Sequence, residues 1–285
     1  MSRIVYVNGA YLPEEEAKIS VFDRGFIFAD GIYEVSAVLD GKLVDCEAHL
    51  DRLFRSCGEI KLPLPWSKAE LLDIHREMIR RNDLVEGGVY LQVTRGAADR
   101  DFTFPKEAVP SLVLFTQARN YTSSPSVKTG LKVVTFPDLR WERRDIKSVG
   151  LLGQVLAKQH AAEQGANDAW LVEDGVVTEG ASSTAWMVKG KTIISRPLSN
   201  KVLPGITRKA LLAFLAETDF SFEERTFTLE EALEAEELFL TSATQFVMPV
   251  TTLDGHSIHN GAPGPATMRL REIYLDYAKD GGKLG

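Results

Sequence analysis

Lys147 is the residue whose neighbours in the sequence first suggest chemistry. Residues 143–148 read Arg-Arg-Asp-Ile-Lys-Ser. Neighbouring cations disfavour a charged ammonium group, and a neutral amine can form a Schiff base with a carbonyl compound. A lysine in a charged loop is more often a solvated surface residue. Lys147 therefore needs support from other parts of the chain before it is assigned a role.

Glu179 is a carboxylate placed where it could act on an aromatic nitrogen. It follows a predicted strand and precedes Gly-Ala-Ser-Ser at residues 180–183. A carboxylate that faces a pyridine nitrogen keeps that nitrogen protonated, so that the ring can accept electrons from a substrate carbanion. The alternative is that Glu179 simply ends a hairpin.

Three segments offer donors for an anion. Gly205, Ile206 and Thr207 begin a predicted helix, and the free amides of a helix N-terminus bind anions. Residues 241–244, Thr-Ser-Ala-Thr, offer a second set of donors, and Arg52 is a bidentate partner for phosphate. Every helix has such an N-terminus and most arginines are surface charges, so each signal is weak by itself.

Composition limits the classes of protein that need to be considered. The chain has 285 residues, is 44% hydrophobic and carries a net charge of −7, which disfavours nucleic acid as a partner because phosphate backbones attract clustered cations. Two cysteines provide neither a disulfide scaffold nor a paired zinc motif. We find no signal peptide and no apolar run of membrane-spanning length. We therefore expect a soluble cytoplasmic protein that needs no metal.

The first part of the chain is predicted to contain strands joined by tight turns, followed by two helices. Asn8-Gly9 and Asp40-Gly41 are turn signals that tolerate positive φ. The spacing of Leu50, Leu53, Phe54 and Cys57 predicts one helix, and a capping box of Ser67 and Glu70 begins a second. Strands are expected over residues 89–93 and 111–118.

The second part is predicted to follow a linker. Residues 120–130 have turn chemistry, and we place a domain boundary there. Beyond it we expect a strand at 131–136, a helix at about 151–164, a hairpin through Asp174-Gly175 and a helix capped by Thr228 with Glu231. The predicted fold class is mixed α/β (α+β), with an N-terminal domain over residues 1–120 and a C-terminal domain over residues 121–285.

Taken in order, these motifs resemble the fold-type IV pyridoxal-phosphate enzymes, the class IV aminotransferases, and among them the D-amino acid aminotransferases. The resemblance spans nearly the whole chain and depends on several ordered motifs rather than on one. The motifs are Asp23-Arg24-Gly25, Tyr33-Glu34-Val35, residues 49–52, Val93-Thr94-Arg95-Gly96, Asp145-Ile146-Lys147-Ser148, Thr178-Glu179-Gly180, residues 203–207 and Thr241-Ser242.

The resemblance implies a site for pyridoxal 5′-phosphate built largely in the larger C-terminal domain, a pseudo-barrel that carries the Schiff-base lysine. Lys147 would form the Schiff base and move the proton, and Glu179 would pair with the pyridine nitrogen. The phosphate would be held by Arg52, Ile206 and Thr207, and by amides near Ala243 and Thr244, although the family often has a threonine where Ala243 stands. Leu203 would lie against the ring, and His49 would support the site near Arg52.

The resemblance also implies substrate-facing residues in the N-terminal domain: Tyr33, Val35, Arg100 and Phe102. In the D-amino acid enzymes a tyrosine and an Arg-x-His pair bind the α-carboxylate. Phe102 stands where that pattern has histidine, so we expect weaker selectivity for a carboxylate and acceptance of bulky D-amino acids or (R)-amines. Arg100 could instead be a solvated loop charge, since Asp99 and Asp101 flank it.

The expected reaction is transfer of an amino group from a D-amino acid to a 2-oxo acid such as 2-oxoglutarate or pyruvate. The resemblance also implies a homodimer in which the Arg100 loop reaches the neighbouring subunit. Branched-chain L-amino acid aminotransferases and aminodeoxychorismate lyases share this fold and cofactor, and they remain alternatives. A protein that binds the cofactor without turnover is an alternative of a different class.

Overall fold

Alternating apolar residues in the first 120 residues form an antiparallel sheet. The computed structural model describes residues 2–282. These residues form two units: unit 1 comprises 2–120, 146–150 and 279–282, and unit 2 comprises 121–145 and 151–278. The short segment around Lys147 thus clusters with the N-terminal residues, whereas its position in the chain had placed it in the C-terminal domain. The functional roles assigned to the two domains stay predictions.

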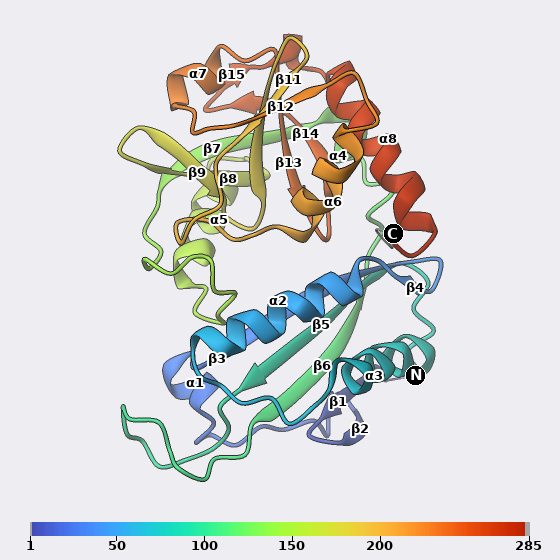
Figure 1. Ribbon diagram of the computed structural model, residues 1–285, viewed down its shortest axis with the longest axis vertical. Helices are drawn as coiled ribbons and strands as arrows, with labels where there is room; N and C mark the ends of the chain where they lie inside the picture. Colours follow the sequence, from blue (N-terminus) through green and yellow to red (C-terminus); the bar gives the residue numbers. More distant parts are fainter. Residues whose placement is uncertain (1, 283–285) are drawn as a thin grey trace. The chain divides into compact units, whose positions relative to one another are not determined.

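Unit 1 is a six-stranded antiparallel sheet in the order β2-β1-β6-β5-β3-β4, with two long helices, α2 and α3, packed on it (Figure 1). Leu50 and Leu53 of α2 and Met78 of α3 are buried against the same face of the sheet. The elements are β1 (Ile4–Val7), β2 (Ala10–Pro13), α1 (Arg24–Phe28), β3 (Gly31–Leu39), β4 (Lys42–Leu43), α2 (Cys46–Glu59), α3 (Lys68–Arg81), β5 (Gly87–Thr94) and β6 (Ser111–Ala118).

Strand β3 presents different residues to the two faces of this sheet. Side chains alternate along a strand, so Ile32 and Glu34 point towards α2, and Tyr33 and Val35 point to the opposite face. Ile32 and Glu34 are fully buried, whereas Tyr33 and Val35 are half-buried. One strand therefore supplies both a buried carboxylate and an accessible tyrosine.

Unit 2 contains a nine-stranded mixed sheet in the order β12-β11-β10-β13-β14-β7-β8-β9, with β15 paired to β14. The pairs β14–β7, β7–β8 and β11–β12 are parallel. The elements are α4 (Ser126–Thr129), β7 (Leu131–Pro137), α5 (Leu152–Glu163), β8 (Asp168–Glu173), β9 (Val176–Gly180), β10 (Thr184–Lys189), β11 (Thr192–Ser195), α6 (Ile206–Leu215), β12 (Ser221–Glu224), α7 (Leu229–Leu233), β13 (Glu237–Ser242), β14 (Phe246–Leu253), β15 (His256–Ser257), the 3₁₀ turn η1 (His259–Gly261) and α8 (Pro265–Lys279).

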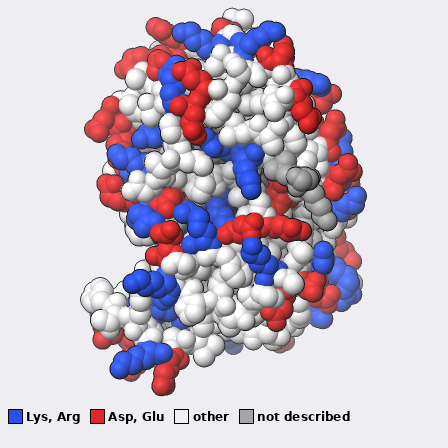
Figure 2. Space-filling view, viewed as in Figure 1, with Lys and Arg blue, Asp and Glu red and all other residues white. Residues whose placement is uncertain are grey.

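The mixed α/β composition predicted from the sequence is confirmed, and so are both capping boxes. On the face shown in Figure 2 acidic and basic side chains are interspersed rather than gathered by sign. Over residues 2–282, none of the helices has the length and apolar character needed to cross a membrane.

Candidate active site

Lys147 is fixed by its backbone against the first residues of β3. Its carbonyl accepts a hydrogen bond from the amide of Tyr33 (3.0 Å), and the amide of Val149 donates to the carbonyl of Gly31 (3.1 Å). The Lys147 amide lies 3.5 Å from the Ser56 hydroxyl of α2. The neighbouring Ile146 is buried in the core of unit 1. The backbone of Lys147 is therefore held in place, and only its side chain can move.

The Lys147 ammonium nitrogen lies beside the Tyr33 phenol. Nζ is 3.3 Å from the hydroxyl oxygen and 4.3 Å from the centre of the ring. The Tyr33 ring stacks on Tyr90 at 5.6 Å, and Tyr90 stacks on Phe115 at 4.6 Å. This row of rings holds the phenol in place, so a predicted substrate-facing residue and the predicted nucleophile lie within hydrogen-bonding distance.

Arg52 is held by a buried carboxylate. Its Nε and Nη2 atoms donate to Glu34 at 2.7 and 2.8 Å, and His49 Nδ1 lies 2.8 Å from the same carboxylate. Burial acts to raise the pKa of Glu34, but the Arg52 guanidinium and the His49 hydrogen bond outweigh it and hold that pKa well below its usual value. The sequence drew attention to Glu34 only as part of a motif. Its position between two apolar residues of a strand was the available signal.

Arg100 and Phe102 lie in a loop next to α1. The Arg100 guanidinium is 5.4 Å from the ring centre of Phe28 and 5.3 Å from that of Phe102, and the two rings are 5.4 Å apart. Arg24 packs on Phe28 at 4.6 Å, and its Nη1 donates to the carbonyl of Asp101 at 2.6 Å. Phe28 is thus in contact with two arginines, whereas the Phe102 side chain is 78% exposed.

Glu179, at the end of β9, is buried and paired. Its Oε1 atom accepts from Arg140 Nη1, and the Leu203 amide lies 3.3 Å from Oε1 and 3.2 Å from Oε2. Arg140 is held in turn by Asp138, at 2.9 Å through Nε and 2.7 Å through Nη2. The structure thus joins Glu179 to Leu203, and it adds Arg140 and Asp138, which the sequence did not single out.

Burial and the Arg140 guanidinium shift the pKa of Glu179 in opposite directions. Burial raises the pKa of Glu179, and the Arg140 guanidinium partly offsets that rise. Burial would lower the pKa of Arg140, but the carboxylates of Asp138 and Glu179 reverse the direction and raise it. The Arg140 charge is therefore firmly retained, whereas the charge on Glu179 depends on its partner.

The start of α6 and the β13–β14 turn lie at one end of the unit 2 sheet. Helix α6 packs against β13 and has no side-chain cap, which leaves the first amides of Ile206 and Thr207 as donors. A Cβ atom on Gly205 would lie 2.8 Å from the Thr184 hydroxyl, and Thr184 pairs with Thr241 of β13. The turn that follows β13 carries Ala243 and Thr244.

These residues of unit 2 fit the pyridoxal phosphate that the resemblance implies. The uncapped helix start suits a phosphate group, and among the described residues Oε2 of Glu179 accepts only the Leu203 amide. A carboxylate oxygen can accept further donors, so Oε2 has room for a protonated ring nitrogen. The Ser183 hydroxyl, in the turn after Glu179, is also buried and has no hydrogen-bond partner within residues 2–282.

The ion pairs of Arg143 and Arg144 differ from what the sequence suggested. Arg143 and Arg144 were expected to disfavour the ammonium form of Lys147. Instead, Arg143 pairs with Asp145 at 3.0 Å, and Arg144 pairs with Glu173 at 3.0 Å. Both positive charges are compensated by carboxylates, so neither arginine is an uncompensated cation next to Lys147 in the sequence.

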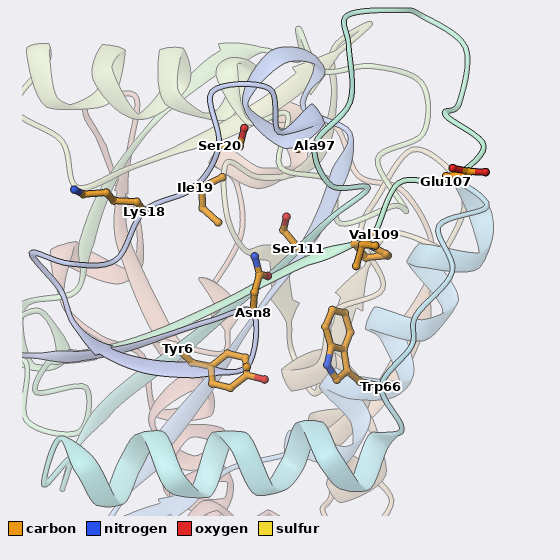
Figure 3. A pocket seen from close by; sticks show the side chains of 12 residues that line it. Tyr6, Asn8, Lys18, Ile19, Ser20, Trp66, Ala97, Glu107, Val109 and Ser111 are labelled. Carbon is orange, nitrogen blue, oxygen red and sulfur yellow. The ribbon is translucent and has the colours of Figure 1, made fainter.

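Unit 1 also contains an open cavity of about 520 Å³, which is separate from the predicted site residues (Figure 3). Its wall includes Tyr6, Asn8, Lys18, Trp66 and Val109. Lys147, Tyr33 and Arg52 are not among its lining residues. The cavity therefore does not contribute to the site described above.

Known proteins resemble this chain along nearly its whole length. The sequence model described as amino-transferase class IV matches residues 31–253. A D-alanine aminotransferase of Staphylococcus haemolyticus is 40% identical over 96% of this chain and 97% of its own. One from Bacillus licheniformis is 39% identical over 94% of each chain.

Solved structures have the same fold at lower identity. A branched-chain amino acid aminotransferase solved with pyridoxamine 5′-phosphate superimposes with a TM-score of 0.90 and is 24% identical, covering 99% of this chain and 95% of its own. The branched-chain amino acid aminotransferase of Escherichia coli gives a TM-score of 0.87 at 20% identity, covering 99% and 96%. The enzyme of the archaeon Thermoproteus uzoniensis, with norvaline, gives a TM-score of 0.88 at 22% identity, again covering 99% and 96%. At these identities the likeness establishes the fold and no more.

Proposed function

The chain belongs to the amino-transferase class IV family, and we propose that this pyridoxal-phosphate-dependent aminotransferase transfers the amino group of a D-amino acid to a 2-oxo acid. The observation that carries the proposal is the 40% identity with a D-alanine aminotransferase along 96% of the chain. The branched-chain enzymes resemble this chain at 24% identity or less. They therefore do not favour an L-amino acid as substrate.

Lys147 is proposed to hold the cofactor and to move the proton. When bound, pyridoxal phosphate supplies an aldehyde that condenses with amines and a ring that accepts electrons. The Lys147 Nζ atom would hold that aldehyde carbon until a substrate amine replaces it, and would then carry the proton between the substrate α-carbon and the cofactor carbon C4′. The fixed backbone of Lys147 and the Tyr33 hydroxyl, 3.3 Å from Nζ, support this role.

The other residues proposed to contact the cofactor are chosen by matching their charge or hydrogen-bonding groups to its parts. In unit 2 the Glu179 carboxylate would hold the ring nitrogen, and Leu203 would lie against the ring. Charged hydrogen bonds suit a phosphate dianion, and Arg52, fixed by Glu34, offers a rigid cation. The amide donors for the phosphate would be those of Ile206, Thr207, Ala243 and Thr244.

Four residues of unit 1 are proposed to face the substrate: Tyr33, Val35, Arg100 and Phe102. The Tyr33 hydroxyl and the Arg100 guanidinium would bind the α-carboxylate, since arginine is a strong partner for that group. Phe102 would add apolar surface beside them, as its 78% exposed ring allows. We expect Phe102→His to increase the preference for D-alanine over an (R)-arylamine. An unchanged ratio of kcat/KM for these two donors would reject that role.

We propose that the protein assembles as a homodimer. Unit 1 exposes large apolar side chains in two segments, residues 19–26 and 102–109, and exposed apolar patches mark interaction surfaces. Sedimentation equilibrium should give twice the chain mass, and a monomer at micromolar concentration would refute the proposal. The exposed apolar residues of these two segments are Ile19, Val21, Phe22, Phe26, Phe102, Phe104 and Val109.

The central test is chemical labelling of the lysine. The purified protein is incubated with pyridoxal phosphate, reduced with borohydride and digested, and the modified peptide is identified by mass spectrometry. We expect the label on Lys147 and none in Lys147→Arg, which keeps the positive charge. A label on another lysine in the wild-type protein would overturn the assignment.

The substrate is tested separately with the same preparation. D-alanine, L-leucine and an (R)-arylamine are mixed in turn with the cofactor-loaded protein, and the change in cofactor absorbance is followed. We expect D-alanine to react fastest. A faster reaction with L-leucine would reject the D-amino acid assignment while leaving the lysine assignment intact.

A further inference from the structure

We propose that Arg140 is a positioning residue, which orients Glu179 and keeps its carboxylate negatively charged for the ring nitrogen of the cofactor. This inference rests on the proposed function, because it assumes that Glu179 is the partner of that nitrogen. Arg140 would act through Glu179 and would not touch the cofactor itself.

The first observation is that the orientation of Arg140 is fixed on the side away from Glu179. Asp138 accepts from Arg140 Nε at 2.9 Å and from Nη2 at 2.7 Å. Asp138 is itself held by the Thr178 hydroxyl at 2.7 Å and by Arg144 Nη1 at 3.1 Å. A guanidinium group is planar, so a two-point contact on one edge determines where the remaining nitrogen, Nη1, points.

The second observation is that this remaining nitrogen bonds a single oxygen of Glu179. Arg140 Nη1 donates to Oε1, whereas the Leu203 amide is the only donor among the described residues that reaches Oε2. The arginine thereby fixes the carboxylate by one oxygen and leaves the other with acceptor capacity. A ring nitrogen with its proton would bind there without displacing Arg140.

The third observation is that Glu179 needs a cation to stay ionised. Its side chain is 6% exposed, and so is that of Arg140. Burial disfavours a carboxylate charge, and an opposite charge in contact restores it. Loss of the Arg140 charge would shift Glu179 further towards its protonated form. A neutral carboxyl group would no longer hold the proton on the ring nitrogen.

Arg144 provides a matched control. Its side chain is 2% exposed and its Nη1 pairs with Asp138 at 3.1 Å, but its other ion pair is with Glu173. Arg144→Met therefore removes a buried cation from Asp138 without removing a contact of Glu179. An effect that depends only on the packing around Asp138 would appear in both arginine variants.

The experiment combines these variants with Glu179→Gln. Arg140→Met, Arg140→Lys and Arg144→Met are each made in the wild-type and in the Glu179→Gln protein. Three quantities are measured: the absorption maximum of the bound cofactor, its dissociation constant, and the rate of the half-reaction with D-alanine. Thermal unfolding of each protein shows whether it is folded.

We expect Arg140→Met to slow the half-reaction by roughly 10- to 100-fold, the range for losing a hydrogen bond to a charged group. It should shift the absorption maximum in the same direction as Glu179→Gln. In the Glu179→Gln background the same substitution should change the rate by less than about twofold, because coupled residues are not additive. Arg140→Lys should recover part of the loss, and Arg144→Met should stay within about twofold of wild type.

Two results would overturn the inference. In the first, the double variant Arg140→Met with Glu179→Gln slows the half-reaction by the product of the two single reductions. In the second, Arg144→Met shifts the absorption maximum as much as Arg140→Met does. If Arg140→Met does not fold, Arg140→Lys provides the same test through its dependence on the Glu179 background. An unchanged rate and spectrum in Glu179→Gln alone would show that the proposed role of Glu179 itself is wrong.

Discussion

Glu34 offers a sharp test of how unit 1 is held together. The perturbation is Glu34→Gln, which keeps the shape of the side chain and removes its charge. The carboxylate is 1% exposed and receives hydrogen bonds from Arg52 Nε (2.7 Å), Arg52 Nη2 (2.8 Å) and His49 Nδ1 (2.8 Å). A glutamine has one acceptor oxygen, and its amide nitrogen would face one of the two Arg52 donors.

The magnitude follows from these contacts. At least one of the three bonds is lost, and each hydrogen bond to a charged group contributes about 1.5–3 kcal/mol. Breaking a buried ion pair from one side costs about 3–5 kcal/mol, because the other charge is left uncompensated. In a chain of this size we expect the melting temperature to fall by on the order of 10 °C.

The assay is thermal unfolding of the cofactor-free protein, followed by circular dichroism at several pH values. The folded-state pKa of Glu34 is lowered, so its stabilisation is complete above the ordinary carboxyl pKa of 4.5 and is lost as the pH falls towards the folded-state value. The difference between wild type and variant should thus be constant from about pH 8 to 6 and should shrink below about 4.5.

Glu77→Gln is the matched control. Glu77 also pairs with two arginines, Arg80 and Arg81, at 2.6 Å each, but on the surface of α3. Exposed pairs contribute little, so this variant should melt close to wild type. Equal destabilisation by the two substitutions, or a loss of less than about 2 °C in Glu34→Gln, would refute the reasoning that burial gives the Glu34 pair its weight.

Three further predictions concern other parts of the chain. We expect Phe28→Ala to raise KM for D-alanine about two- to fivefold and to leave an (R)-arylamine unaffected, because a ring in contact with guanidinium groups contributes about 0.5–1 kcal/mol; Val85→Ala, at a 65% exposed side chain, should change neither KM. Arg271, 2% exposed, donates to four backbone carbonyls, so Arg271→Met should lower the free energy of unfolding by about 3 kcal/mol in a urea titration, and a midpoint equal to that of wild type would contradict this. Burial raises the pKa of Cys46 and of Cys57 to about 12, so neither thiol should react with a disulfide reagent at pH 8 until the protein unfolds, and rapid reaction of the folded protein would show that the thiols are accessible.

Local signals were enough to predict the turns and several helix starts. Asp40-Gly41 and Asp174-Gly175 adopt the positive φ angles that their types predicted. The capping box of Ser67 begins α3 as expected. These features depend on residues within three or four positions of each other, so the sequence contains all that is needed to find them.

Elements fixed by distant residues were not predictable in the same way. Helix α8 was not predicted, and its first amides, those of Ala266 and Thr267, are capped by the side chain of Glu237 at 2.9 and 2.8 Å. The hydrogen bond that places Lys147 joins it to Tyr33, 114 residues earlier. Arg140 and Glu179 meet across 39 residues. Local sequence patterns do not show which distant residues come into contact in the folded chain.

Two of the residues proposed to bind the cofactor, one in each unit, are each held by a buried side chain of opposite charge. In unit 1 a buried carboxylate, Glu34, fixes the cation Arg52, and in unit 2 a buried cation, Arg140, fixes the anion Glu179. Pyridoxal phosphate has an anionic phosphate at one end and a ring nitrogen that binds a proton at the other, so its two ends require opposite partners. An unpaired buried charge is costly, and a flexible one loses entropy when it binds its ligand. In the proposed site each charge that faces the cofactor is paired with a second buried charge, so Glu34 and Arg140 should matter nearly as much to cofactor binding as Arg52 and Glu179.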